Sequence, residues 1–293
     1  MNPIGIQYLY WNTGCLSDAL TWTAGAGADV LECGTMAVVE MSSAQRKDFG
    51  REVRNRGLSL TLNGGVPGAD LCARDPELRQ KSVALSCEAI QAAADVGSPI
   101  WSGVIYTRWL DIPQKPFTFQ EQEEMWARGV ESLQKVLPVA ERCGVNVCFE
   151  VVNRFEAYMI TTVAEGVRFC RDINSPNAQL LLDTFHMNIE EDSLAAAMSQ
   201  AMESGRFGHL HICESNRGLP GLTPTDTDWP ALLSTLRKTG YPGVVTMEPM
   251  VLRSSPSSAK YRIWRDMVPD GAPDTLFRCA SASVAFIRKA MEP

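Results

Sequence analysis

The chain has 293 residues, of which 45% are hydrophobic and 21% charged, a composition typical of a folded globular protein rather than a disordered or fibrous one. The formal net charge is −7, and no stretch gathers the lysines and arginines that phosphate contacts require, so we expect no nucleic-acid partner. No run of about 18 apolar residues and no amino-terminal signal pattern occur, so we expect a cytoplasmic protein with no membrane partner.

The chain contains nine cysteines, an odd number, and none of them form a C-x-x-C pair. Several, including Cys33, Cys148 and Cys213, fall within apolar runs that resemble strands. This pattern favours reduced thiols over a disulfide framework. We therefore expect all nine cysteines to be small buried hydrophobic residues.

Short apolar runs alternate with longer helical patterns along the whole chain, and eight such units can be counted. Most of these runs are continuously apolar, which is typical of parallel strands covered by helices on their outer face. The predicted strands span residues 4–10, 29–34, 58–62, 100–105, 145–151, 179–183, 207–213 and 243–248.

Alternating strands and helices build either an open doubly wound sheet or a closed barrel. The segment QYLYWNTG at the end of the first strand, residues 7–14, lacks the glycine-rich fingerprint of a dinucleotide site, and eight regular units favour closure. We therefore predict an α/β fold, a single-domain (β/α)₈ TIM barrel over residues 1–293. The long irregular segment 251–272 after the eighth strand should lie at the catalytic face.

Polar residues stand at or near the ends of four successive predicted strands, namely Glu150, Asp183, His211 and Glu248. The carboxyl ends of barrel strands converge on one face, so these side chains should surround one point. A single acid there can simply cap the next helix, but four on consecutive strands indicate a site. Three carboxylates and one imidazole suit Mn²⁺, Mg²⁺ or Co²⁺ more than a thiolate zinc site, although zinc also binds such ligands.

The three histidines of the chain, His186, His209 and His211, all lie within 26 positions. His209 and His211 point to the same side of a strand because side chains alternate with period two. Spacing alone therefore does not decide which of the two binds a metal. A lone histidine in an apolar strand is more often a hydrogen-bonded core residue, but Asp183 and the two glutamates favour a ligand role for at least one.

Five segments resemble the ketose 3-epimerases related to tagatose and allulose (psicose) 3-epimerases, within the xylose-isomerase-like barrel superfamily. They are FEVVNRFE (149–156), LLLDTFHMNIEE (181–191 with the preceding leucine), GHLHICESNRGLPG (208–221), MEP (247–249) and WRD (264–266). The resemblance covers residues 145–266 most closely. It implies one divalent ion, Mn²⁺ before Co²⁺ or Mg²⁺, held by Glu150, Asp183, His211 and Glu248. Relatives also suggest a homodimer or homotetramer.

The resemblance implies further roles around the predicted metal. The family's arginine follows its ligand histidine at the spacing of His211 and Arg217, which selects His211 and leaves His209 in the core or behind the ligands. The same comparison implies that Glu156, His186 and Arg217 hold the O1 and O2 end of the sugar, while Trp109 forms an aromatic side of the pocket. Aromatic residues are common in the family where this chain has Gln7 and Cys15, so sugar preference is open.

The resemblance also implies a small-molecule ketose substrate and metal-dependent inversion at carbon 3. Removing that proton creates an enediolate, which a divalent ion and Arg217 or His186 would stabilise. Glu150 and Glu248, on strands at opposite sides of the barrel mouth, would serve as the catalytic base and acid. An aldose–ketose isomerase on the same scaffold is the nearest alternative. A multi-zinc endonuclease and a non-catalytic sugar-binding protein fit less well, because histidines are few and two opposed glutamates are present.

Overall fold

Eight parallel strands close into one barrel in the computed structural model, which describes residues 1–223 and 225–292. Each strand pairs with its neighbours in the sequence, and β1 also pairs with β8, with Ile6 opposite Met247. The predicted (β/α)₈ TIM barrel is confirmed, while the extent of a single domain over residues 1–293 stays a prediction. The strands are β1 (Ile4–Gln7), β2 (Val30–Gly34), β3 (Ser59–Asn63), β4 (Ile100–Gly103), β5 (Asn146–Glu150), β6 (Ala178–Asp183), β7 (Phe207–Ile212) and β8 (Val245–Met247).

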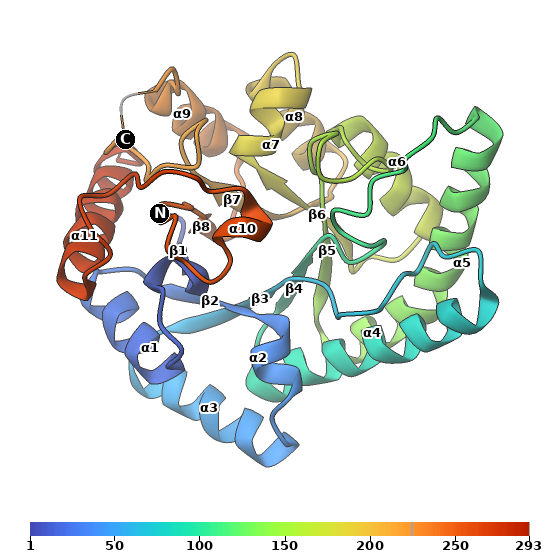
Figure 1. Cartoon of the computed structure of the whole chain (residues 1–293), viewed down its shortest axis with the longest axis horizontal. Helices are drawn as coiled ribbons and strands as arrows, with labels where there is room; N and C mark the ends of the chain where they lie inside the picture. The colour runs from blue at the N-terminus through green and yellow to red at the C-terminus, as the bar shows by residue number, and fades with distance from the viewer. Residues whose placement is uncertain (224, 293) are drawn as a thin grey trace.

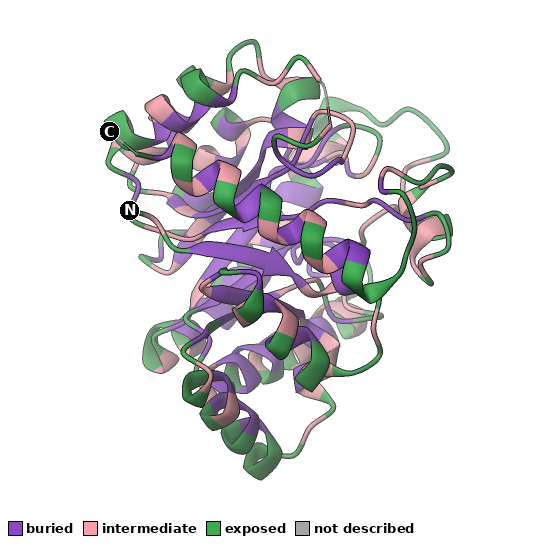
Figure 2. Cartoon of the chain, turned by 90° about the vertical axis from the view of Figure 1, so that its left-hand side faces the viewer, coloured by how far each residue is buried: buried purple, intermediate pink, exposed green. Residues whose placement is uncertain are grey.

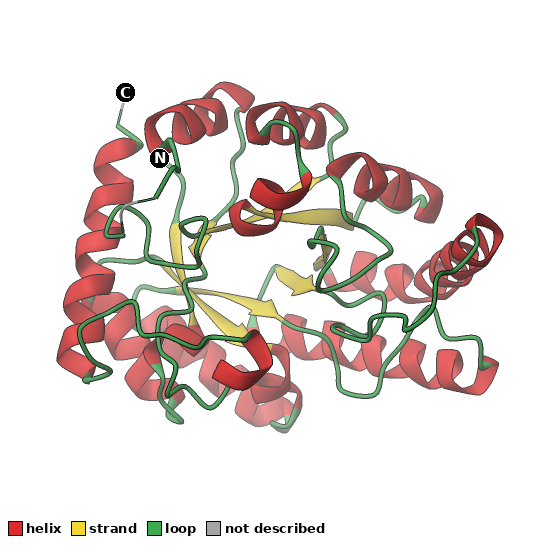
Figure 3. Cartoon of the chain, turned by 45° about the horizontal axis from the view of Figure 1, so that its top comes forward, coloured by secondary structure: helices red, strands yellow, loops and turns green. Residues whose placement is uncertain are grey.

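Helices surround the barrel on its outside (Figures 1 and 3). Among the described residues, none of these helices is both long and apolar enough to cross a membrane. Their bounds are η1 (Tyr8–Trp11), α1 (Leu16–Gly25), α2 (Thr35–Val39), α3 (Ser43–Asn55), α4 (Pro76–Val96), α5 (Phe119–Cys143), α6 (Val163–Ile173), α7 (Thr184–Glu190), α8 (Leu194–Glu203), α9 (Trp229–Thr239), α10 (Ser258–Tyr261) and α11 (Pro273–Ala290).

Local sequence explains why these helices form and which side they bury. Helix α5, for example, begins with a reciprocal capping box between Thr118 and Glu121, and it ends at Gly144, whose φ of 67° is left-handed. Its buried positions include Leu133 and Leu137, spaced four residues apart so that they lie on one face. Figure 2 shows the same division, with buried residues concentrated in the strands and exposed ones on the outer sides of the helices.

Some predictions about the ends of strands and about cysteines were wrong. The first strand ends at Gln7 rather than Tyr10, because the chain turns into the 3₁₀ helix η1. The segment 251–272 is not wholly irregular, since it contains the short helix α10. All nine cysteines are free, but only five are buried. Cys87, Cys143 and Cys279 are partly exposed because they lie on helices, and Cys15 is exposed because it stands at the start of α1.

An irregularity between β6 and β7 fixes the direction of the barrel histidines. Leu180 pairs with Phe207, but the next residue, Leu181, pairs with His209, so Gly208 is an extra residue in β7. A one-residue shift in register turns every following side chain to the opposite face of a strand. Beyond the irregularity, Asp183 pairs with His211. The bulge therefore places the side chains of Asp183 and His211 on the same face of the sheet, next to each other.

Candidate active site

The four residues predicted as metal ligands lie together at the carboxyl ends of four neighbouring strands. Each of Glu150, Asp183, His211 and Glu248 is buried and offers one ligand atom, and these atoms all lie within 4.8 Å of one another. Glu150 and Asp183 are the last residues of β5 and β6, His211 lies in β7, and Glu248 directly follows β8. Their meeting is therefore a consequence of parallel strand order, as predicted.

Asp183 serves the fold as well as the cluster. Its Oδ1 accepts a hydrogen bond of 2.9 Å from the backbone N–H of Phe185 and so caps helix α7. Its other oxygen, Oδ2, lies against the guanidinium of Arg217. One oxygen of Asp183 is thus a helix cap, while the second faces the site, where it contacts Arg217.

The donor atoms fit a divalent cation in type and in spacing. Oxygen and nitrogen ligands bind such ions at about 2.0 to 2.6 Å, so two ligand atoms of one ion lie no more than roughly 5 Å apart. Neither ring nitrogen of His211 has a hydrogen-bond partner among the described residues; Nδ1 lies 3.3 Å from Glu248 Oε2 in the cluster, and Nε2 lies 2.7 Å from Glu32 Oε1 behind it. A buried ring nitrogen that faces carboxylates and makes no hydrogen bond is in the position that a metal ligand requires.

The charges of the cluster also favour a bound cation. Burial raises the pKa of Glu150; the His186 imidazole opposes this shift, and the negative charge of Glu248 adds to it. Burial alone would raise the pKa of Asp183 too, but the Arg217 guanidinium and two imidazoles hold that pKa well below its usual range. Several carboxylates in one buried place repel each other, so positive charge is needed to keep them together.

Arg217 supplies part of that positive charge. Its Nη1 atom contacts both Asp183 and Glu248, the latter at 2.9 Å, and its Nη2 atom lies 3.2 Å from His186 Nε2. The backbone of Arg217 has a φ of 67°, in the left-handed region that costs a non-glycine residue roughly 1 to 3 kcal/mol. Such strain is most often found where the direction of a side chain serves a site.

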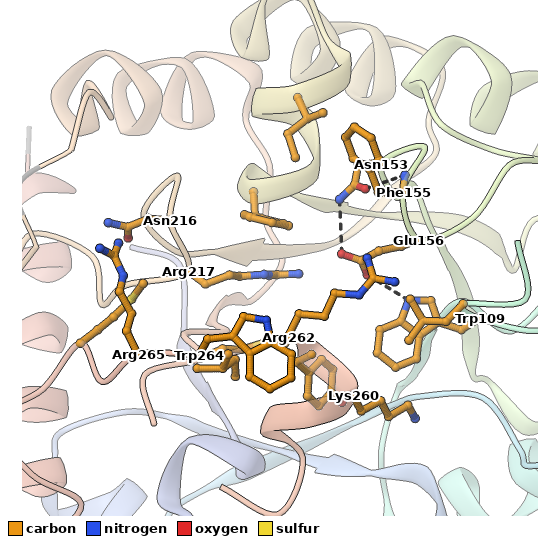
Figure 4. A pocket seen from close by; sticks show the side chains of 17 residues that line it. Trp109, Asn153, Phe155, Glu156, Asn216, Arg217, Lys260, Arg262, Trp264 and Arg265 are labelled. Atoms are coloured by element: carbon orange, nitrogen blue, oxygen red, sulfur yellow. Dashed lines mark hydrogen bonds between the residues drawn. The ribbon is translucent and has the colours of Figure 1, made fainter. Parts of the chain in front are cut away.

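The other predicted sugar-binding residues form a connected row beside the cluster. The backbone N–H of Asn153 donates to His186 Nδ1 at 3.2 Å, which directs His186 Nε2 towards Glu150 Oε1 at 3.4 Å. The Asn153 side chain also donates to Glu156 Oε1 at 3.3 Å, and the indole N–H of Trp109 donates to Glu156 Oε2 at 2.9 Å (Figure 4). Glu156 and His186 are thus linked through one asparagine.

Two adjoining cavities open above these residues. The inner one, of about 140 Å³, is lined by Glu150, Glu248 and His186 among others. The outer one, of about 600 Å³, shares Trp109 and Arg217 with it and is lined on one side by residues of the 251–272 segment, among them Trp264 and Arg265 (Figure 4). The combined space has the size of a small-molecule site. The irregular segment after β8 therefore lies at the mouth of the site, as predicted.

Several residues of the site were not predicted from the sequence. Asn153 gave no signal beyond its place in the FEVVNRFE segment, and Tyr261 lies in the segment predicted to be irregular. The Tyr261 ring lies 5.2 Å from that of Trp109, so both aromatic rings border the cavity. Glu32 was also missed as a site residue, although an acid inside the apolar strand β2 is the same signal that identified the other acids.

Gln7 and Cys15, which stand where the family commonly has aromatic residues, lie in different surroundings. Gln7 is buried at the end of β1 and borders a small cavity together with Glu248. Its side chain accepts a hydrogen bond of 2.8 Å from the backbone N–H of Leu9. Cys15 is exposed at the start of α1. Only Gln7 is therefore near a proposed catalytic residue, and the effect of both on sugar preference stays a prediction.

Comparisons with known proteins agree with this geometry. A family model described as xylose isomerase-like TIM barrel matches residues 20–262. D-psicose 3-epimerase of Ruminiclostridium cellulolyticum is 33% identical over 98% of this chain and 97% of its own. L-ribulose 3-epimerase of Mesorhizobium japonicum is 29% identical over 92% of this chain and 89% of its own. A crystal structure of D-psicose 3-epimerase with D-tagatose from Clostridium cellulolyticum H10 superposes with a TM-score of 0.92, at 32% identity, over 99% of this chain and 100% of that one.

The chain belongs to the xylose isomerase-like TIM barrel family. Within that family it is a member of the ketose 3-epimerases, and hence an enzyme of the isomerase class.

Proposed function

We propose that this enzyme inverts carbon 3 of free ketoses with the help of one divalent ion. The observation that carries the proposal is the gathering of Glu150, Asp183, His211 and Glu248, whose ligand atoms lie within 4.8 Å of one another at the barrel mouth. The family membership of the chain supports the same reaction. Glu150 and Glu248 would combine two roles, as ligands and as proton-transfer groups.

Inversion requires a base on one face of carbon 3 and an acid on the other. Glu150 ends β5 and Glu248 follows β8, with two strands between them, so the two carboxyl groups approach a bound sugar from different sides. One removes the C3 proton, and the other returns a proton to the opposite face; the roles exchange in the reverse direction. Burial raises the pKa of Glu150, which brings it closer to the range in which an acid also donates.

The negative charge that develops on the sugar oxygens must be stabilised. A divalent ion, when bound, supplies Lewis-acid polarisation of the keto group. Arg217 and His186 lie against the acid cluster and would donate hydrogen bonds to the oxygen on carbon 2. Glu156, held by Trp109 and Asn153, would accept a hydrogen bond from the hydroxyl on carbon 1. The ring of Trp109 would pack against the sugar.

Relatives that act on D-psicose and L-ribulose guide the choice of substrates. We propose the pairs D-fructose and D-allulose, D-tagatose and D-sorbose, and L-ribulose and L-xylulose as candidates. The hard oxygen-rich ligand set favours Mn²⁺, with Co²⁺ or Mg²⁺ as alternatives. The homodimer or homotetramer suggested by relatives stays a prediction, which sedimentation-velocity measurements would check.

The test is a product analysis with a panel of sugars. The purified protein, treated with EDTA and then supplied with Mn²⁺, is incubated with D-fructose, D-allulose, D-tagatose and L-ribulose. A new ketose that forms only after metal is added back supports the proposal. A new aldose would instead support the aldose–ketose isomerase, and full activity in EDTA would contradict the role of the metal.

A further inference from the structure

A second cluster of ionisable groups lies inside the barrel, next to the acid cluster. It consists of Glu32 on β2 with His209 and His211 on β7, all with no exposed surface. Glu32 Oε2 lies 2.7 Å from His209 Nε2, and Glu32 Oε1 lies 2.7 Å from His211 Nε2. The hydroxyl of Thr61 on β3 donates to Glu32 Oε2 at 3.0 Å. One carboxylate therefore contacts both imidazoles of β7.

These contacts give the two nitrogens of His211 different surroundings. Nε2 faces the Glu32 carboxylate, whereas Nδ1 faces the acid cluster and lies 3.3 Å from Glu248 Oε2. A neutral imidazole has one N–H and one lone pair, and the nearer of two carboxylates favours the hydrogen on the nitrogen beside it. Glu32 is the nearer one, at 2.7 Å against 3.3 Å for Glu248, so the hydrogen is favoured on Nε2. The lone pair is then left on Nδ1, the side on which a metal ligand is needed.

We propose that Glu32 is a positioning residue, which orients His211 so that Nδ1 is presented to the metal ion; this inference rests on the proposed function. Thr61 and His209 hold Glu32 in place by occupying its other oxygen. The ligand-type atoms of Glu32, His209 and His211 are also close enough to share an ion, but His211 belongs to the acid cluster too, which offers four ligand residues instead of three. An ion held by the acid cluster through Nδ1 of His211 leaves Glu32 behind the ring, at Nε2. Glu32 therefore acts on the metal through His211.

The burial of Glu32 supports a role beyond packing. An isolated buried carboxylate is costly, and an apolar residue of similar volume would fill the same place without that cost. Outer partners of metal-bound histidines commonly contribute 10- to 100-fold to metal affinity, because they fix the ring and raise the basicity of the ligand nitrogen. Removing the charge of Glu32 while keeping its shape should reveal this contribution.

The experiment measures Mn²⁺ binding by isothermal titration calorimetry with protein freed of metal. Wild type should bind one Mn²⁺ per chain, and Glu32→Gln should bind it roughly 10- to 100-fold more weakly. Thr61→Val, which keeps the carboxylate but removes one hydrogen bond to it, should weaken binding about 2- to 10-fold. Ser102→Ala on β4, a buried polar residue whose hydroxyl donates to Leu62 O, should leave Mn²⁺ affinity unchanged.

The outcomes separate this inference from the proposed function. If wild type binds no Mn²⁺, the proposed function fails and this inference fails with it. If wild type binds one Mn²⁺ and Glu32→Gln binds it equally well, only the role of Glu32 is overturned. Two ions in wild type, one of them lost in Glu32→Gln, would show that Glu32 is itself a ligand. Should Glu32→Gln fail to fold, an unchanged affinity in Thr61→Val would overturn the proposal.

Discussion

The indole N–H of Trp109 donates a hydrogen bond of 2.9 Å to Glu156 Oε2, so the aromatic side of the pocket holds a carboxylate in place. Sequence comparison implied that both residues contact the sugar, but not that they contact each other. This contact gives Trp109 a role that a different aromatic ring would not fill.

Replacing Trp109 by Phe keeps an aromatic ring but removes the hydrogen bond to Glu156. We expect KM to rise about 2- to 10-fold with kcat nearly unchanged, because a lost hydrogen bond costs roughly 0.5 to 1.5 kcal/mol. Steady-state kinetics with the preferred ketose measure both constants. Trp126→Phe is the matched control, since the Trp126 indole donates to Asp172 at 3.0 Å outside the site. Equal KM values in wild type and Trp109→Phe would argue against this role of the hydrogen bond.

Gly208 is the extra residue in β7 that brings His211 opposite Asp183. A Cβ atom there would lie 2.5 Å from the Cβ of Gln179 and 2.8 Å from the sulfur of Cys148. Gly208→Ala should therefore lower the free energy of unfolding by roughly 1 to 3 kcal/mol, measured by urea denaturation. Gly14→Ala is the control, because no described atom beyond its chain neighbours lies within 4 Å of its added Cβ. A stability loss that is the same in both variants would show that the bulge tolerates a side chain.

Metal binding should stabilise the folded chain. At a free Mn²⁺ concentration of about 100 times Kd, linkage adds roughly 2.7 kcal/mol, which corresponds to a rise in Tm of roughly 5 to 10 °C. Asp183→Asn should lose most of this rise because it removes a buried ligand, whereas Asp48→Asn, at an exposed position on α3, should keep it. Thermal unfolding with and without EDTA provides the measurement. A rise of similar size in Asp183→Asn would place the ion elsewhere.

Replacing Glu150 or Glu248 by Gln keeps the shape of the side chain but removes a proton-transfer group that is also a proposed metal ligand, so both variants are assayed in excess Mn²⁺. Loss of a general acid or base typically lowers the rate about 10²- to 10⁴-fold, so kcat should fall at least about 100-fold in each variant. Equilibrium binding of the ketose should be reduced much less, because Arg217, His186 and Glu156 remain. Turnover near that of wild type in either variant would remove that glutamate from the mechanism.

The sequence predicted the barrel and the acid cluster for a simple reason. Apolar runs mark strands, and parallel strands bring their carboxyl ends to one face, so acids that end such runs must meet. Which face His209 and His211 point to, however, depends on the bulge at Gly208, and a shift in pairing has no signal in a single strand. The contact of Glu32 with both histidines joins β2 to β7 across the barrel interior, a relation that strand order alone does not give.

The pocket itself was less predictable than the cluster. The ring of Tyr261 packs beside that of Trp109. Tyr261 is the last residue of the four-residue helix α10, and the serine-rich sequence around it gave no signal for a helix. The left-handed backbone of Arg217 is likewise a property of its turn, since arginine has no preference for that conformation. Contacts between segments far apart in the sequence decide such features.

Proton exchange with solvent tests most directly whether two acids act on opposite faces of carbon 3. The wild-type enzyme with its metal is incubated with D-allulose or another accepted ketose in D₂O, and the sugars are analysed by NMR at low conversion. We expect the product ketose to carry deuterium at carbon 3, while the unreacted substrate keeps its hydrogen. Product without deuterium at carbon 3, or deuterium at carbon 1 instead, would contradict the two-acid mechanism.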